Sequence, residues 1–276
     1  MSEANFLELE GMSKMDSMYE KARRGQPLDD VLVIDSHCHM GPYHQFNAPN
    51  NSAEGMLESM DALGVNMAFV TAHASIGPDY VYGNDMVIDA VRKYTGRFLG
   101  YVTLNPHYPE DMIHELDRCF AIPGMKGIKL HPSCHGVSID YENYTPAYEY
   151  ANERKLPMLI HVWGIGQVLT VDKLAGKYHD MKFLMGHSGG DVQAMEEAIR
   201  VINSHDNVYG DLALSIVREG NVEWLVDKIT SKKLLYASDM PFFDPRPAFG
   251  RVAMAQISPE EKRDVFGLNM KRMLDL

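Results

Sequence analysis

The segment 31-VLVIDSHCHMG-41 carries the strongest structural signal in the chain. Its apolar run over residues 31–34 has the composition of a strand that is covered on both faces, which is typical of parallel sheets. The run passes almost at once into His37 and His39, which are separated by a single residue. We therefore interpret this segment as a buried strand that ends in a polar site.

Seven further segments of the same kind follow along the chain: 66-NMAFVTAH, 97-RFLGYVTLNP, 126-KGIKLHP, 157-PMLIHVW, 182-KFLMGHSGG, 207-NVYGDLALS and 233-KLLYASDMP. Amphipathic segments with helical spacing lie between them, among them 53-AEGMLESMDALG, 84-NDMVIDAVRKYTG, 110-EDMIHELDRCF and 191-DVQAMEEAIRVINS. Eight strands, each followed by a helix, predict an α/β fold, the (β/α)8 TIM barrel. An open doubly wound sheet is the alternative, although such a sheet usually has fewer strands.

The two ends of the chain lie outside this repeat. Residues 1–30 precede the first strand, and their Leu and Met spacing predicts a short N-terminal helical extension that packs on the barrel or on a neighbouring molecule. The last segment, 258-SPEEKRDVFGLNMKRMLDL-276, predicts a closing helix that begins with a capping box of Ser258 and Glu261. We expect residues 1–276 to form a single domain.

The overall composition limits the classes of partner. With 26 Lys+Arg against 38 Asp+Glu, the formal net charge is −12, which argues against a nucleic-acid binder because such proteins carry a basic surface. No apolar run reaches the length of about 18 residues that a membrane span needs. The N-terminus lacks the pattern of a secretory signal and the three cysteines form no CxxC pair, so we expect a cytoplasmic protein. Because two-fold dimers are the commonest oligomers, we expect a homodimer whose ligand is a small molecule.

Further polar residues stand at the ends of later strands. His161 ends the fifth predicted strand, His187 the sixth and Asp239 the eighth. The carboxyl ends of all strands meet at one face of a barrel, so these side chains should share one cavity with the two histidines of the first strand. Alternation along a strand turns both of those imidazoles to one face. A metal site explains four imidazoles and a carboxylate in one cavity better than five independent structural roles would.

The same residues carry a resemblance to a known family. An HxH motif on the first strand, histidines on the fifth and sixth strands and an aspartate on the eighth are similar to the pattern of the amidohydrolase superfamily. The closing segment resembles that of the amidohydrolase-related branch, which includes aminocarboxymuconate semialdehyde decarboxylase. The resemblance extends over nearly the whole chain after residue 30, and it indicates a metal site but no substrate. The other segments that carry the resemblance are 126-KGIKLHP, 156-LPMLIHVWG, 184-LMGHSGG and 235-LYASDMPFFDPR.

The resemblance implies a role for each of these residues. In the family pattern, one divalent metal ion is bound by His37, His39, His161 and Asp239. His187 lies beside the ion as a general acid or base. Zinc suits imidazole and carboxylate ligands with one open position, and manganese, iron or nickel are alternatives. Such an ion lowers the pKa of water to about 7 and polarises a carbonyl group. Either His187 or Asp239 could then carry the proton to the leaving group.

The fourth predicted strand contributes Lys129 and His131, whose spacing of two turns both towards the interior. In two-metal members of the superfamily, a carbamylated lysine on this strand bridges the ions. The resemblance therefore allows a second ion that is held by Lys129. We favour the alternative, in which Lys129 only shapes the pocket, and we expect one ion per chain.

Less specific candidates surround this set. Trp163 ends the fifth strand two positions after its histidine, and His73 ends the second strand. Asp211 lies within the seventh strand, where it could hold a metal-bound histidine in place. Arg218 and Arg246 fall in loops at the expected mouth of the barrel, where a guanidinium could bind a substrate carboxylate through two hydrogen bonds.

Three functions fit this pattern. The leading hypothesis is a metal-dependent hydrolase, in which activated water attacks an amide, ester or lactone of a small molecule. The alternative enzyme is a metal-dependent, non-oxidative decarboxylase of a small aromatic carboxylic acid, which would use the same fold and ligands. The third is a non-catalytic, metal-stabilised binding module. A closed site of four ligands would be enough for such a module, and His187 as a fifth group argues against it.

Overall fold

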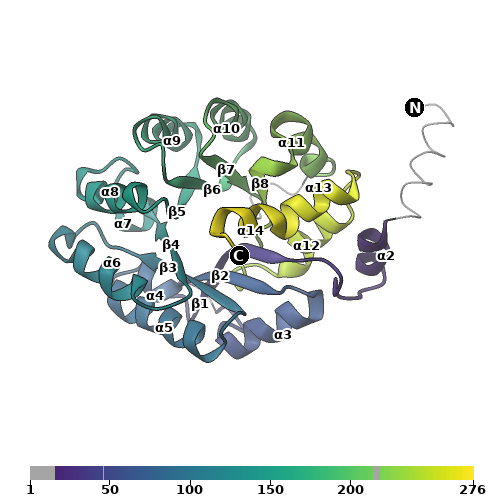
Figure 1. The fold of residues 1–276 in the computed structure, drawn as a ribbon, viewed down its shortest axis with the longest axis horizontal. Helices are drawn as coiled ribbons and strands as arrows, with labels where there is room; N and C mark the ends of the chain where they lie inside the picture. Colours follow the sequence, from purple (N-terminus) through teal and green to yellow (C-terminus); the bar gives the residue numbers. More distant parts are fainter. Residues whose placement is uncertain (1–15, 46, 214–217) are drawn as a thin grey trace.

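The computed structural model describes residues 16–45, 47–213 and 218–276. Within them, eight parallel strands follow one another in the order β1 to β8. Helices lie between the strands and surround them (Figure 1). The predicted (β/α)8 TIM barrel is therefore confirmed. The strands are β1 (Ile34–Met40), β2 (Met67–Ala72), β3 (Phe98–Thr103), β4 (Met125–Leu130), β5 (Pro157–Trp163), β6 (Lys182–Gly189), β7 (Val208–Asp211) and β8 (Leu234–Leu235).

Backbone hydrogen bonds close the ring between β1 and the segment that contains β8. The amide of Ser36 donates to the carbonyl of Tyr236 at 3.0 Å. The amide of Asp239 donates to the carbonyl of His37 at 2.9 Å. Strand β8 itself is only two residues long, and these bonds continue the pairing beyond it. They place Asp239 directly beside the end of β1.

Several helices begin where the sequence offers a cap. Ser52 accepts a hydrogen bond from the amide of Gly55 at the start of α3, and Asp191 does the same for Ala194 in α10. None of the described helices is long and apolar enough to cross a membrane. The helices are α2 (Ser17–Arg23), α3 (Ala53–Leu63), α4 (His73–Ile76), α5 (Tyr80–Lys93), α6 (Met112–Phe120), α7 (Pro132–His135), α8 (Thr145–Glu153), α9 (Ile165–Lys177), α10 (Val192–Ser204), α11 (Asn221–Ile229), α12 (Pro245–Ala253), α13 (Pro259–Arg263) and α14 (Asn269–Leu274), with short turns η1 (Pro109–Asp111), η2 (Glu142–Tyr144) and η3 (Ser231–Lys233).

The closing segment is interrupted, whereas the sequence predicts one continuous helix. Helix α13 begins with the expected capping box, in which Ser258 and Glu261 exchange hydrogen bonds. A π-helical turn, η4 (Asp264–Leu268), then separates α13 from α14. Within this turn Gly267 lies against Leu32, where an added Cβ would come 2.4 Å from the carbonyl oxygen. The wider turn thus accompanies a close approach to the residues that precede β1.

Apolar side chains pack in two layers. The larger layer lies between the strands and the surrounding helices and includes Val70 of β2 and Ile202 of α10. The smaller layer fills the barrel interior, as side chains do in barrels of this size. The polar residues His39, Lys129 and His161 lie towards the carboxyl ends of their strands. The interior layer consists of Ile34, Phe69, Leu99, Tyr101, Leu159, Leu184, Leu235 and Met270.

The predicted N-terminal extension is described from residue 16 onward, and residues 1–15 lie outside the described residues. Its helix α2 contacts α12 on the outside of the barrel (Figure 1). Asp16 caps α2 by accepting a hydrogen bond from the amide of Met18, and it also forms an ion pair with Lys262 of α13. Both charged side chains are buried. The extension is therefore joined to the C-terminal part of the chain by a buried pair of charges.

Candidate metal site

Two histidines of β1 face the interior at the carboxyl end of the barrel. His37 and His39 are 1% and 2% exposed, and their ring centroids lie 5.3 Å apart. Ile34 also faces the interior. On a regular strand, residues three positions apart face opposite sides, so Ile34 and His37 could not both point inward. The register with β2 shifts between Asp35 and Cys38, and this irregularity reverses the alternation. The bulged backbone of β1 thereby turns both imidazoles into the site, while Cys38 packs in the outer layer.

Asp239 lies against both of these histidines. Its Oδ1 atom is 3.1 Å from Nε2 of His39 and 3.7 Å from Nε2 of His37. This oxygen is buried and has no hydrogen-bond partner among the described residues, so its short distance to His39 is not a hydrogen bond. The possible ligand atoms of the three residues all lie within 4.8 Å of one another. Three potential metal ligands therefore converge on one point.

Left-handed backbone conformations occur at two of the strand ends that form the site. The angle φ is 62° at His187, 46° at Ser188 and 61° at Asp239, although none of these residues is glycine. Each such residue costs roughly 1–3 kcal/mol and persists only where surrounding contacts hold it. Strain of this kind clusters at functional sites. Here it coincides with two polar residues that the sequence analysis selected.

A row of rings lies beside these residues. His131 stacks on His161 with ring centroids 4.0 Å apart, and the Trp163 ring is nearly parallel to that of His161 at 6.4 Å. His187 meets His161 edge to face, with its Nε2 3.1 Å from Nδ1 of His161. Burial lowers the pKa of both His161 and His187 to about 3, so both rings are neutral at pH 7. The barrel thus brings together the polar ends of β4, β5 and β6.

His161 is separate from the set formed by Asp239 and the β1 histidines. Its partner His187 belongs to a second group of possible ligand atoms, with His37 and Asp211, again within 4.8 Å of one another. Neither group found among the described residues contains His161. The assignment of His161 as a fourth metal ligand therefore stays a prediction, as does the catalytic role of His187.

Lys129 of β4 is completely buried and reaches β1. Its Nζ atom donates a hydrogen bond to Nε2 of His37 at 3.1 Å. Burial lowers the pKa of Lys129 to about 8. Burial and the charge of Lys129 also hold the pKa of His37 well below its ordinary value of 6.5. Lys129 therefore lies inside the site and contacts a candidate metal ligand.

Two buried carboxylates support the site from behind. Asp211 contacts the ring Nδ1 of His37 at 2.8 Å and accepts a hydrogen bond from the amide of His187 at 2.7 Å. Asp35 accepts hydrogen bonds from the amides of His37 and Ser238 at 3.3 and 3.0 Å. Burial raises the pKa of each of these two carboxyl groups to about 6. The sequence analysis names Asp211 but misses Asp35, which its position two residues before His37 could have indicated.

An aromatic wall lies next to His39. The ring of His73 stacks on His39 with centroids 5.1 Å apart, and Phe242 lies 4.3 Å from His73. Tyr43 contacts Phe242 edge to face at 4.7 Å. Nδ1 of His73 donates to the carbonyl of Gly41 at 2.6 Å. The sequence analysis does not select Phe242. The only signal for this residue in the sequence is its position in the loop after β8.

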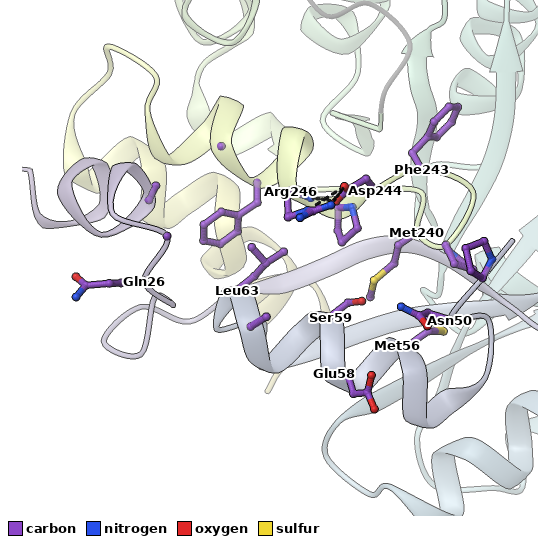
Figure 2. Close-up of a pocket in the computed structure, with 18 of the residues that line it drawn as sticks. Gln26, Asn50, Met56, Glu58, Ser59, Leu63, Met240, Phe243, Asp244 and Arg246 are labelled. Carbon is purple, nitrogen blue, oxygen red and sulfur yellow. Dashed lines mark hydrogen bonds and ion pairs between the residues drawn. The ribbon is translucent and has the colours of Figure 1, made fainter.

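The two arginines predicted at the mouth lie in other surroundings. Arg246 lines an open groove of about 820 Å³ between α2, α3 and α12, where its guanidinium pairs with Asp244 (Figure 2). Arg218 lines a smaller cavity with Glu196 and Trp224. The site histidines line neither space. Recognition of a substrate carboxylate by either arginine stays a prediction.

Comparison with known proteins relates this geometry to a family. The amidohydrolase family model, Amidohydro_2, matches residues 34–276, which include all eight strands. The chain belongs to the amidohydrolase family of enzymes. The resemblance found in the sequence is thereby confirmed. Enzymes of this family depend on metal ions, and in this amidohydrolase the buried set of His37, His39 and Asp239 is a candidate site for one. No curated protein sequence matches the chain.

Solved structures share the fold of this amidohydrolase at low sequence identity. The 2,6-dihydroxybenzoate decarboxylase from Rhizobium has a TM-score of 0.75 and 15% identity, over 89% of this chain and 99% of that one. The 5-carboxyvanillate decarboxylase from Novosphingobium aromaticivorans, in complex with manganese, gives 0.74 and 16%, over 90% and 97%. The 4-oxalomesaconate hydratase from Rhodopseudomonas palustris gives 0.68 and 19%, over 88% and 96%. At these identities the likeness shows the barrel fold alone.

Proposed function

We propose that this amidohydrolase is a metal-dependent hydrolase that uses water to cleave an amide, ester or lactone of a small molecule. The convergence of His37, His39 and Asp239 on one point carries the proposal. In this proposal His161 is the fourth ligand, and His187 moves the proton. One divalent ion per chain completes the site, with zinc first and manganese, iron or nickel as alternatives.

The residues present fit such an ion. In a tetrahedral zinc site with bonds of about 2.1 Å, two ligand atoms lie roughly 3.4 Å apart. Oδ1 of Asp239 lies 3.1 and 3.7 Å from the Nε2 atoms of His39 and His37. This buried oxygen has no hydrogen-bond donor among the described residues, which a bound cation would explain. Burial also holds the pKa of both histidines well below 6.5, and a metal ligand must be a neutral imidazole.

Lys129 distinguishes a site for one ion from a site for two. Its ammonium donates to Nε2 of His37, which is the atom that a metal ion would take. A carbamate on this lysine would remove the positive charge and offer an oxygen ligand to a second ion. We propose the site with one ion, in which Lys129 shapes the pocket.

A divalent ion bound here would polarise a carbonyl oxygen and lower the pKa of water. The chain itself supplies the path for the proton. His187 is neutral, and its buried Nδ1 has no partner among the described residues. Were His161 to bind an ion through Nε2, its Nδ1 would carry the hydrogen and donate it to Nε2 of His187 3.1 Å away. The hydrogen of the neutral His187 ring would then lie on Nδ1, from which it can be donated to a leaving group. Trp163 lies beside His187, and its side chain is about half exposed, so that a substrate can contact it there.

Non-oxidative decarboxylation is the second candidate. The stacked rings of His131, His161 and Trp163, together with the wall of His73 and Phe242, suit a flat aromatic substrate. Two of the solved structures with this fold are decarboxylases of 2,6-dihydroxybenzoate and 5-carboxyvanillate. The same ligands would then hold a substrate oxygen while CO₂ leaves. The net charge of −12 gives such an acid no general attraction.

Metal analysis tests the proposal without a substrate. Elemental analysis of untagged protein should find about one divalent ion per chain, and the His39→Asn variant should lose it. The exposed His179 provides the matched control, and His179→Asn should keep the ion. Protein that holds no transition metal and gains none when it is added contradicts the proposal. A content near two ions per chain would instead support a carbamate on Lys129.

The reaction class needs a separate assay. A panel of lactones, esters and amides should be tested beside carboxylated phenols, with hydrolysis and CO₂ release measured on the same enzyme preparation. Hydrolysis that disappears in the His39→Asn variant supports the first candidate. Release of CO₂ from a phenolic acid without hydrolysis of any panel member supports the second.

A further inference from the structure

We propose that Asp211 is a positioning residue that fixes the tautomer of His37, so that Nε2 of this ring is the nitrogen presented to the metal ion. The inference rests on the proposed function, because it assumes that His37 is a metal ligand. It concerns the side chain behind the ligand and not the ion itself.

The contacts of the His37 ring fix which nitrogen carries the hydrogen. Nδ1 lies 2.8 Å from Oδ2 of Asp211, and both residues are at most 1% exposed. An ionised carboxylate only accepts hydrogen bonds, so the hydrogen must be on Nδ1. On the opposite side, Nζ of Lys129 lies 3.1 Å from Nε2. An ammonium only donates, so Nε2 must have its lone pair free. Two independent partners therefore select the same tautomer.

The second oxygen of Asp211 holds another part of the site. Oδ1 accepts hydrogen bonds from the amides of His187 and Ala213 at 2.7 and 3.1 Å. The backbone carbonyl of Asp211 accepts a hydrogen bond from the hydroxyl of Ser188 at 2.6 Å. His187 and Ser188 are two consecutive non-glycine residues with left-handed backbone. One residue of β7 thus orients a ring of β1 and also stabilises the strained end of β6.

These contacts argue that Asp211 is not itself a ligand. Its oxygens belong to a group of possible ligand atoms with His37 and His187. Both oxygens already have hydrogen-bond donors, namely one ring nitrogen and two amides. A metal bond to Oδ1 would displace one of its two amide donors and leave a buried donor without a partner, which typically costs about 1–3 kcal/mol. Only one lone-pair position, on Oδ2 beside the His37 ring, has no donor. By contrast, Oδ1 of Asp239 has no donor to lose.

The Asp211→Asn variant tests the inference because it conserves shape and changes only the hydrogen-bonding character. If the amide nitrogen faces His37, it donates to Nδ1 and moves the ring hydrogen to Nε2, where it blocks the metal. If the amide turns round, its NH₂ group meets the amide of His187, which is also a donor. Either way the site is disturbed. Loss of a partner behind a metal ligand typically weakens metal binding about 10–100-fold.

The readout is the affinity of metal-free protein for cobalt(II), measured by absorbance in competition with a chelator. We expect Asp211→Asn to bind cobalt(II) about 10–100-fold more weakly than the unchanged protein. Glu115→Gln is the matched control, because Glu115 is a buried carboxylate that bonds to Asn84 and Arg118 and has no hydrogen bond to a histidine of the site. It should bind with nearly unchanged affinity. Equal losses in both variants, or none in Asp211→Asn, would overturn the inference.

A second measurement needs no metal. The ¹⁵N shifts of the His37 ring in the metal-free protein report which nitrogen is protonated. We expect Nδ1–H and an unprotonated Nε2 in the unchanged protein, and a change in that pattern in Asp211→Asn. The opposite tautomer in the unchanged protein would overturn the inference. Failure of the unchanged protein to bind cobalt(II) would instead count against the proposed function, and the ring shifts would still test the role of Asp211.

Discussion

The imidazoles of His161 and His187 face each other edge to face, with Nδ1 of His161 3.1 Å from Nε2 of His187. Only one hydrogen can lie between these two nitrogens, so one ring donates and the other accepts. Burial lowers the pKa of both rings to about 3, and neither carries a charge at pH 7. The two residues therefore act as a pair, although we assign one to the metal ion and the other to the proton.

Substitution of each histidine separates these assignments. His187→Asn should leave the metal content nearly unchanged and should lower the rate about 10²–10⁴-fold, because it removes a general acid or base. His161→Asn should lose both metal and activity. Elemental analysis gives half of this test before any substrate is known. A His187→Asn variant without metal, beside a His161→Asn variant that keeps it, would show that the two roles are exchanged.

The stability of the fold should fall in acid because of His135. This ring is buried next to the hydroxyl of Tyr144 at 2.8 Å, and burial lowers its pKa to about 4 from the ordinary 6.5. The unfolded chain therefore binds a proton between pH 6.5 and 4 that the folded chain excludes. The contribution is complete above pH 6.5 and is lost as the pH falls towards 4, by at most about 3 kcal/mol.

Urea unfolding at several pH values measures this effect. The free energy of unfolding of the unchanged protein should decline between pH 6.5 and 4 more steeply than that of His135→Gln. His179→Gln is the control, because this exposed histidine should leave the slope unchanged. Parallel pH profiles for the unchanged protein and His135→Gln would refute the prediction.

The buried ion pair of Lys262 and Asp16 should be important for stability. Lys262 is 1% exposed, and its ammonium also donates to the carbonyl of Ala253 at 2.8 Å. Asp16→Asn can still cap α2 but leaves the lysine charge buried without its partner, which typically costs about 3–5 kcal/mol. Lys21→Met removes the more exposed ion pairs of the same helix with Asp29 and Asp30, and it should cost at most about 1 kcal/mol. Urea unfolding of both variants measures the difference, and equal losses would contradict it.

Gly190 should be required for the position of Trp163. Its φ is 85°, and an added Cβ would come 2.5 Å from the indole ring. Gly164 provides the matched control, because its φ is 87° but no atom lies within 4 Å of its added Cβ. Both alanine variants should lose roughly 1–3 kcal/mol because of the positive φ at these positions. Only Gly190→Ala should shift the indole.

The fluorescence of Trp163 is a direct readout of this movement. The chain has two tryptophans, so the comparison is made in a Trp224→Phe background. We expect the emission maximum and near-ultraviolet circular dichroism to change in Gly190→Ala and to stay constant in Gly164→Ala. Identical spectra for the two variants would show that Trp163 does not depend on the missing Cβ.

The alternation of strands and helices follows from signals that act over a few residues. Apolar runs of strand length and amphipathic segments mark the elements, and Ser52 and Ser258 cap helices at the expected positions. These signals depend on neighbours within about four positions along the chain. For this reason the barrel, and the presence of His37, His161 and Asp239 at its strand ends, could be predicted from the amino-acid sequence.

The contacts within the site depend on the closed barrel instead. Periodicity indicates which face a side chain occupies, but the stagger of the strands determines which atom of a distant strand it meets. The register shift in β1 and the left-handed backbone at His187 alter that direction locally. The pairing of His187 with His161, the burial of Lys129 against His37 and the position of Arg246 in an outer groove all follow from such long-range packing. No short stretch of sequence encodes these contacts, because each one joins residues that become neighbours only when the whole ring closes.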